Sequence, residues 1–175
     1  MSLALCWLPP EDLNLDPVPP FRSHANARTR EALLAAVEQF QLEVAARYVA
    51  RWIDDRGKRV FITLCNFAAR DIAIAMGCAW PRMTANELFD WLSSTEGKVA
   101  GWRAVDVYKA EELANEGKPV VAVVKRSGHG HVAVGVPTPP GQFGLHVAQA
   151  GKVNFSSGPV GKGFGRLQFL CFAHV

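Results

Sequence analysis

Cysteine is scarce in this chain, and its spacing matches no common metal site. The four cysteines are Cys6, Cys65, Cys78 and Cys171. No Cys-x-x-Cys motif occurs, and His129 with His131 alone is a weak ligand pair. We therefore expect no metal and no other cofactor.

The same cysteines are poorly placed for disulfides. A regular helix between Cys65 and Cys78 would hold them about 20 Å apart, which is too far for a disulfide. Cys6 and Cys171 can pair only if the two ends of the chain meet. This usage is typical of a chain made in a reducing compartment.

Long apolar runs, basic runs and internal repeats are also absent. No stretch approaches the length of a membrane-spanning helix, and there is no Lys/Arg run or aromatic RNA-binding motif. The 19 basic and 16 acidic residues give a net charge of +3, which is too small to indicate a nucleic-acid partner. A mildly basic protein would nevertheless approach an anionic polymer readily. We expect no membrane span and no nucleic-acid binding.

Proline is concentrated near the N-terminus. Five prolines between positions 9 and 20 exclude a helix there and predict an extended N-terminal arm over residues 1–26. The remaining residues, 27–175, fit a single domain with a hydrophobic core. The segment MSLALCWLPPEDL lacks a basic n-region and a small-residue cleavage site. We therefore expect synthesis in the cytoplasm without a clear signal peptide.

Helical patterns dominate the first part of this domain. Apolar residues at helical spacing predict a long helix from about Arg28 to Trp52. A second helix should begin at Cys65, directly after the apolar segment 60–64, and end near Gly77. The capping box MTANE predicts a helix over residues 85–92, and YKAEELANEG predicts another that ends at Gly117.

Strand patterns follow. The apolar segments 119–124, 131–136 and 145–149 and the terminal LQFLCFAHV each predict a strand. Helices followed by a run of strands indicate an α+β domain whose helices pack on a mostly antiparallel sheet. We expect the Gly/Ser-rich segment KVNFSSGPVGKGFG to be a mobile loop near the functional site.

Cys65 is the strongest candidate for chemistry. At a helix start, unpaired amides and the helix dipole favour an anion, so they lower the pKa of a thiol and can also polarise a substrate carbonyl. The neighbouring Asn66 is a candidate for oxyanion or substrate binding, or for a local cap. The alternative is a buried structural cysteine, because free cysteine is often buried.

A histidine and an amide on later strands complete a possible triad. His131 begins a strand beside the glycine-rich turn GHG, and Gln149 lies on the next strand, where its amide can hold an imidazole. His129 is the weaker candidate base and a candidate substrate-binding residue. Asn154 is the rival to Gln149, whereas we expect His146 to be a packing or surface residue.

The segments TLCNFAARDIAIAMG, GHGHVAVGVP and LHVAQAG, taken together, resemble papain-like cell-wall hydrolases, which include NlpC-type endopeptidases and CHAP amidases. The resemblance covers roughly residues 40–155. It implies a papain-like (NlpC/CHAP-like) catalytic domain in which Cys65 is the nucleophile, His131 the base and Gln149 the third residue. Asn66 departs from the pattern, because many of these hydrolases have aspartate or serine at that position.

By this resemblance, the protein would be a peptidoglycan amidase or endopeptidase, as in a phage endolysin or a secreted antibacterial effector. The implied partners are bacterial peptidoglycan and an immunity or delivery protein, and we expect a monomer. It would act on the cell wall after export or lysis. The alternatives are a papain-like transferase or deamidase that acts on a protein, and a non-catalytic wall-binding module.

Overall fold

The computed structural model describes residues 21–55 and 57–175 together with the backbone of residues 5–6. The helices are α1 (Arg30–Glu38), the 3-10 helix η1 (Ala46–Tyr48), α2 (Cys65–Ala75), α3 (Ala85–Ser93), α4 (Thr95–Val99), α5 (Val107–Asn115) and α6 (Val160–Phe164). The strands are β1 (Leu5–Cys6), β2 (Arg51–Asp55), β3 (Lys58–Thr63), β4 (Trp102–Val105), β5 (Val120–Val124), β6 (His131–Val136), β7 (His146–Gln149), β8 (Phe155–Pro159) and β9 (Leu170–His174). The predicted α+β class is confirmed.

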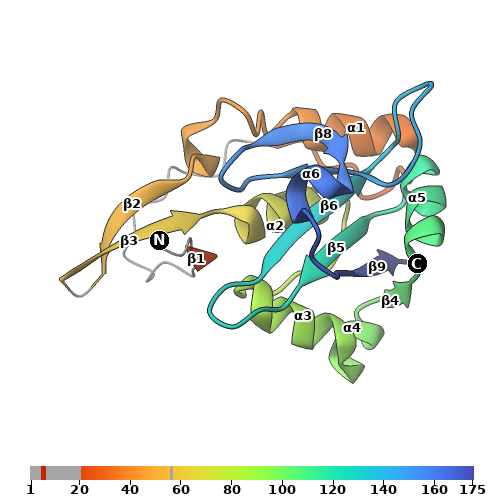
Figure 1. The fold of residues 1–175 in the computed structure, drawn as a ribbon. Helices are drawn as coiled ribbons and strands as arrows, with labels where there is room; N and C mark the ends of the chain where they lie inside the picture. Colours follow the sequence, from red (N-terminus) through yellow and green to blue (C-terminus); the bar gives the residue numbers. More distant parts are fainter. Residues whose placement is uncertain (1–4, 7–20, 56) are drawn as a thin grey trace.

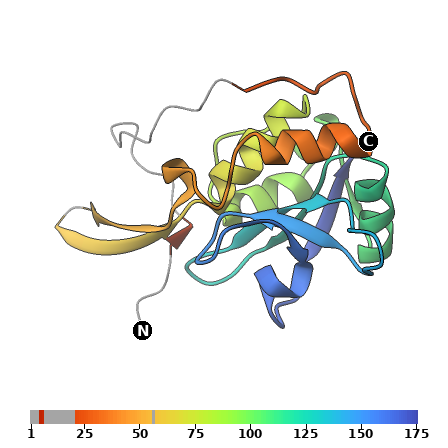
Figure 2. The ribbon, with the colours of Figure 1, turned by 90° about the horizontal axis from the view of Figure 1, so that it is seen from above.

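Two sheets organise these elements (Figure 1). The larger sheet has six strands in the order β4-β9-β5-β6-β7-β8, and all of its neighbouring strands are antiparallel. The smaller sheet has the order β1-β3-β2, in which β1 runs parallel to β3. The hairpin of β2 and β3 projects away from the large sheet in both Figure 1 and Figure 2.

Helices cover both faces of the large sheet. Alternate residues of β6 point to opposite faces, so Val132 and Val134 join one buried cluster with α1, α2 and α3. Ala133 joins the other cluster, which includes residues of α5 and Phe164 of α6. All five residues of β5 are apolar and buried, because this central strand is covered on both faces.

A buried ion pair attaches the segment before β2 to the cysteine helix. Asp71 of α2 accepts hydrogen bonds from Arg47 Nε at 2.9 Å and from Tyr48 Oη at 2.7 Å. Both Arg47 and Asp71 are buried. The network fixes η1 against α2 and therefore fixes the orientation of the helix that begins with Cys65.

The prediction of one long helix from Arg28 to Trp52 is wrong. Helix α1 ends at Glu38, and the chain then turns through Gln41, which has a positive φ of 47°. It continues through η1 and enters β2 at Arg51. Apolar residues continue at helical spacing because Phe40, in the turn after α1, and Tyr48, in η1, are both core residues.

The other predicted elements agree more closely with the structure. Helix α3 begins after Thr84, whose side chain forms the predicted capping box with Glu87. Strand β6 has the predicted bounds, 131–136. The expected mobile loop, in contrast, contains β8 and α6, because Phe155 and Phe164 are buried in the second cluster and anchor the segment.

The predicted arm, residues 1–26, falls mostly outside the described residues. Within it, the structure describes the short strand β1, and residues 21–26 contain no helix or strand. Among the described residues, no helix has both the length and the apolar character needed to cross a bilayer.

Asp71→Ala should destabilise the domain by about 3 kcal/mol, because it removes the counter-charge of a buried guanidinium. Tyr48→Phe should cost only about 1 kcal/mol, because it removes one hydrogen bond and leaves the ion pair in place. Urea unfolding followed by circular dichroism measures both free energies. Equal losses in the two variants would contradict the leading role of the ion pair.

Candidate active site

The two polar residues predicted on neighbouring strands are in direct contact. Strands β6 and β7 are antiparallel, with Val134 opposite Ala148. Continuing this register toward the start of β6 places His131 diagonally across from Gln149 on the same face. The structure confirms the contact, since His131 Nε2 lies 2.7 Å from Gln149 Oε1.

Further contacts fix the direction of this hydrogen bond. Gln149 Nε2 donates to the carbonyl oxygen of Val153 at 2.9 Å, so the amide oxygen faces the imidazole. An amide oxygen only accepts. His131 therefore carries its hydrogen on Nε2, which leaves Nδ1 as the basic nitrogen.

Glycines enclose the pair closely. A Cβ on Gly163 would overlap Gln149 Oε1, and a Cβ on Gly151 would lie 3.3 Å from Gln149 Nε2 and 3.6 Å from His131 Cε1. The ring of Phe164 packs against the imidazole, with their centroids 4.9 Å apart. Helix α6 thus acts as a wall that holds the imidazole and the amide together.

This environment keeps the imidazole neutral. Burial lowers the pKa of His131 below 6.5, and the hydrogen bond to Gln149 opposes this shift only in part. Burial also lowers the pKa of His129. A neutral imidazole with a free Nδ1 at neutral pH is suited to act as a general base.

A cavity of about 770 Å³ opens beside His131. Both members of the pair line it, together with His129, Lys162 and Gly163. Thr63, the last residue of β3, also lines it, so the cavity reaches the segment that leads into α2. The volume is within the range of small-molecule and substrate sites.

Cys65 is the first residue of α2, as predicted. Helix α2 packs on β6 and β7, and Cys65 belongs to the same buried cluster as Val132 and Ala150, the neighbours of His131 and Gln149. Val132 faces α2, whereas His131 lies on the opposite face of the strand beside α6. Among the described residues that line the cavity, the one nearest to Cys65 in the sequence is Thr63, and Cys65 itself is not one of them.

The beginning of α2 is buried and has no side-chain cap. The residue that precedes it, Leu64, provides no side-chain cap for the helix. The first-turn amides at the end of a helix favour negative charge. The side chain of Asn66 is directed elsewhere, because its Nδ2 donates to the carbonyl oxygen of Met83 at 2.9 Å.

The oxidation state of the cysteines differs from the expectation of reduced thiols. Cys65 is buried and disulfide-bonded. Cys78 and Cys171 are free, so Cys171 does not pair with Cys6. Burial raises the pKa of Cys78 to about 11 and that of Cys171 to about 12, which makes both thiols poor nucleophiles at neutral pH.

The remaining candidates have separate roles. Asn154 donates to the carbonyl oxygens of Leu42 and Tyr48 and accepts from the Gly151 amide, so its recorded partners are backbone groups. His146 is buried and contacts Gln142 Oε1 at 2.7 Å, which agrees with a packing residue. His129 lines the cavity but is not a recorded partner of Gln149.

Sequence reasoning missed Gly163 and Arg126, which also lines the cavity. Gly163 lies in a segment that we expected near the site, but only as a mobile loop and not as a helix that packs against Gln149. Arg126 lies in a loop, and no local pattern relates it to His131. Both reach the site through tertiary packing.

No protein-family model matches this chain, and no curated protein matches it. The chemistry of the site therefore rests on its own geometry.

In Cys65→Ala, the imidazole of His131 should titrate below pH 6.5, because burial penalises its charged form. Adding Gln149→Leu should lower the pKa further, since the hydrogen bond from the imidazole to Gln149 raises it. Heteronuclear NMR of the histidine rings measures both values. A higher pKa in the double variant would contradict the role given to Gln149.

Proposed function

We propose that the protein is a peptidoglycan hydrolase of the papain-like class, an amidase or endopeptidase that uses Cys65 as its nucleophile. The observation that carries the proposal is the His131–Gln149 pair, held in one tautomer at a cavity bordered by the end of β3. Cys65 begins the helix that packs on the same two strands. This combination of a thiol, a neutral imidazole and an orienting amide is suited to acyl transfer.

Each residue then has a defined task. The Cys65 thiolate attacks the amide carbonyl, and the first-turn amides of α2 stabilise the oxyanion. His131 Nδ1, protonated when the thiolate forms, gives its proton to the leaving amine and then takes one from the attacking water. Gln149 accepts the hydrogen bond from Nε2–H throughout, which keeps Nδ1 as the basic nitrogen.

With Cys65 in a disulfide, the protein is in an oxidised form that has no nucleophile. A disulfide sulfur is neither a thiolate nor a nucleophile. A dithiol reductant such as dithiothreitol would exchange with it, releasing the Cys65 thiolate and its partner thiol while the reductant becomes a cyclic disulfide. Catalysis thus requires two electrons from a thiol of this class.

The choice of peptidoglycan rests on the resemblance of the three segments around Cys65, His131 and Gln149. A transferase or deamidase that acts on a protein would use the same residues, and the products distinguish the two. The disulfide at Cys65 favours a different candidate, a non-catalytic wall-binding module with a structural cysteine.

Reduced wild-type protein should clear suspensions of purified cell walls and release new amino or carboxyl ends, identified by mass spectrometry. The oxidised protein and the reduced Cys65→Ala variant should both be inactive, because neither provides a thiolate. Circular dichroism checks that the variant keeps its fold. Wall clearance by reduced Cys65→Ala would reject the nucleophile, and wall binding without cleavage by reduced wild type would favour the non-catalytic module.

Gly163→Ala should lower wall-hydrolysing activity at least about tenfold, because the new methyl group displaces Gln149 and with it the imidazole. Gly161→Ala is a matched control in the same helix, since a Cβ at that position meets no atom within 4 Å. It should keep activity near that of wild type. Equal activities in the two variants would show that α6 does not position the pair.

A further inference from the structure

The cavity beside His131 is unusually one-sided in charge. Its positively charged lining residues are Arg126, Lys152 and Lys162. No aspartate or glutamate occurs among the described residues that line it. A cavity with fixed cations and no carboxylate attracts an anionic group, and the protein walls strengthen that attraction relative to bulk water.

Two of these cations, Arg126 and Lys152, form no ion pair with another described residue. The charge of Lys162, in contrast, helps to lower the pKa of Glu43. Lys162 also lies over the ring of Phe155, with Nζ 4.5 Å from the centroid. Arg126 and Lys152 are left with their charge free for a ligand.

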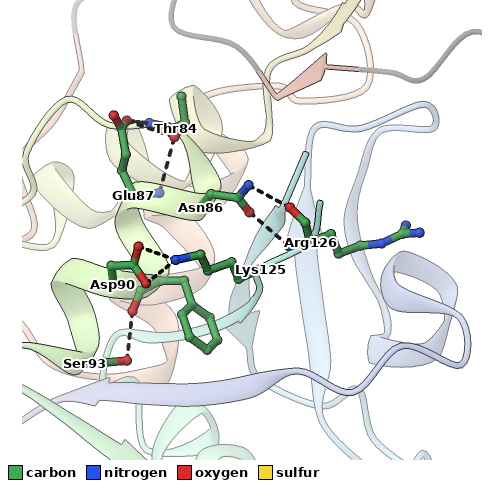
Figure 3. A network of polar contacts seen from close by, with 8 residues as sticks. Thr84, Asn86, Glu87, Asp90, Ser93, Lys125 and Arg126 are labelled. Carbon is green, nitrogen blue, oxygen red and sulfur yellow. Dashed lines mark hydrogen bonds and ion pairs between the residues drawn. The ribbon is translucent and has the colours of Figure 1, made fainter. Parts of the chain in front are cut away.

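Helix α3 holds Arg126 in place by its main chain. The Asn86 side chain accepts from Arg126 N at 3.1 Å and donates to Arg126 O at 2.9 Å. The adjacent Lys125 is paired with Asp90, whose Oδ1 and Oδ2 lie 2.7 Å and 2.5 Å from its Nζ. Figure 3 shows the two side chains extending in opposite directions, so that the guanidinium is directed away from α3.

We infer that the cavity recognises a free carboxylate on the substrate, next to the scissile amide, and that Arg126 is its main counter-charge with Lys152 in support. A guanidinium binds a carboxylate through two parallel hydrogen bonds, which gives geometric specificity as well as charge. This inference rests on the proposed function. It adds a preference for stem peptides with free carboxylates over amidated ones.

A matched pair of synthetic stem peptides tests the preference. One has the free α-carboxylate of a γ-linked D-glutamate, and the other has a carboxamide at that atom. Reduced wild type should cleave the acid with kcat/KM on the order of tenfold higher, as expected for one charge-assisted contact. The ratio should fall as salt is raised, because salt screens the attraction.

Arg126→Gln should raise KM for the acid with little change in kcat, and leave the amide substrate unaffected, because the contact binds ground state and transition state alike. Lys125→Gln is the matched control. It removes the same charge from the neighbouring residue, whose ammonium is paired outside the cavity, so it should keep the preference of the wild type.

The outcomes separate this inference from the proposed function. Equal cleavage of both peptides by reduced wild type, with Cys65→Ala inactive, would overturn the carboxylate site and leave the hydrolase in place. If neither peptide is cleaved, calorimetric binding to Cys65→Ala decides the matter. Tighter binding of the acid, lost in Cys65→Ala/Arg126→Gln, supports the site, and equal or absent binding overturns it.

Discussion

The antiparallel pairing of β6 with β7 is the constraint on which the candidate site depends. It brings two residues that are 18 positions apart to within one hydrogen bond, His131 Nε2 to Gln149 Oε1. Three neighbouring residues hold this contact in place. Val153 orients the amide, Gly163 allows α6 to approach it, and Phe164 covers the imidazole. The strand pairing thus brings the imidazole and the amide together, and the Val153 carbonyl in the bend after β7 fixes the tautomer by orienting the amide.

The two candidate catalytic residues are supported by helices on opposite faces of the large sheet. One face carries α2 with Cys65, and the other carries α6, which encloses the imidazole. The cavity lies at His131, the first residue of β6, and extends to Thr63 at the end of β3. Asp71 secures this arrangement from a distance, because its buried ion pair with Arg47 keeps α2 from shifting on the sheet.

In the proposed chemistry, the disulfide at Cys65 controls when the nucleophile is available, and the cationic lining of the cavity controls which substrate binds. The disulfide withholds the sulfur of Cys65 until a thiol donor is present, while Cys78 and Cys171 remain buried with raised pKa values. The cationic lining acts on the substrate, because it attracts an anionic group. Two residues of α3 give the adjacent basic residues different roles. Asp90 pairs with Lys125, whereas Asn86 binds only the main chain of Arg126 and leaves its guanidinium available for binding.

The sequence by itself determined the local features. It predicted the helix at Cys65, the capping box at Thr84 and the strand at His131, because caps, dipoles and periodicity act over a few residues. Tertiary structure decided the rest. The segment 39–52 became a turn, η1 and the start of β2 rather than a helix, and the segment at Gly163 became a wall of the site, since both depend on distant side chains. Arg126 likewise gained its place only when Asn86 of α3 bound its main chain.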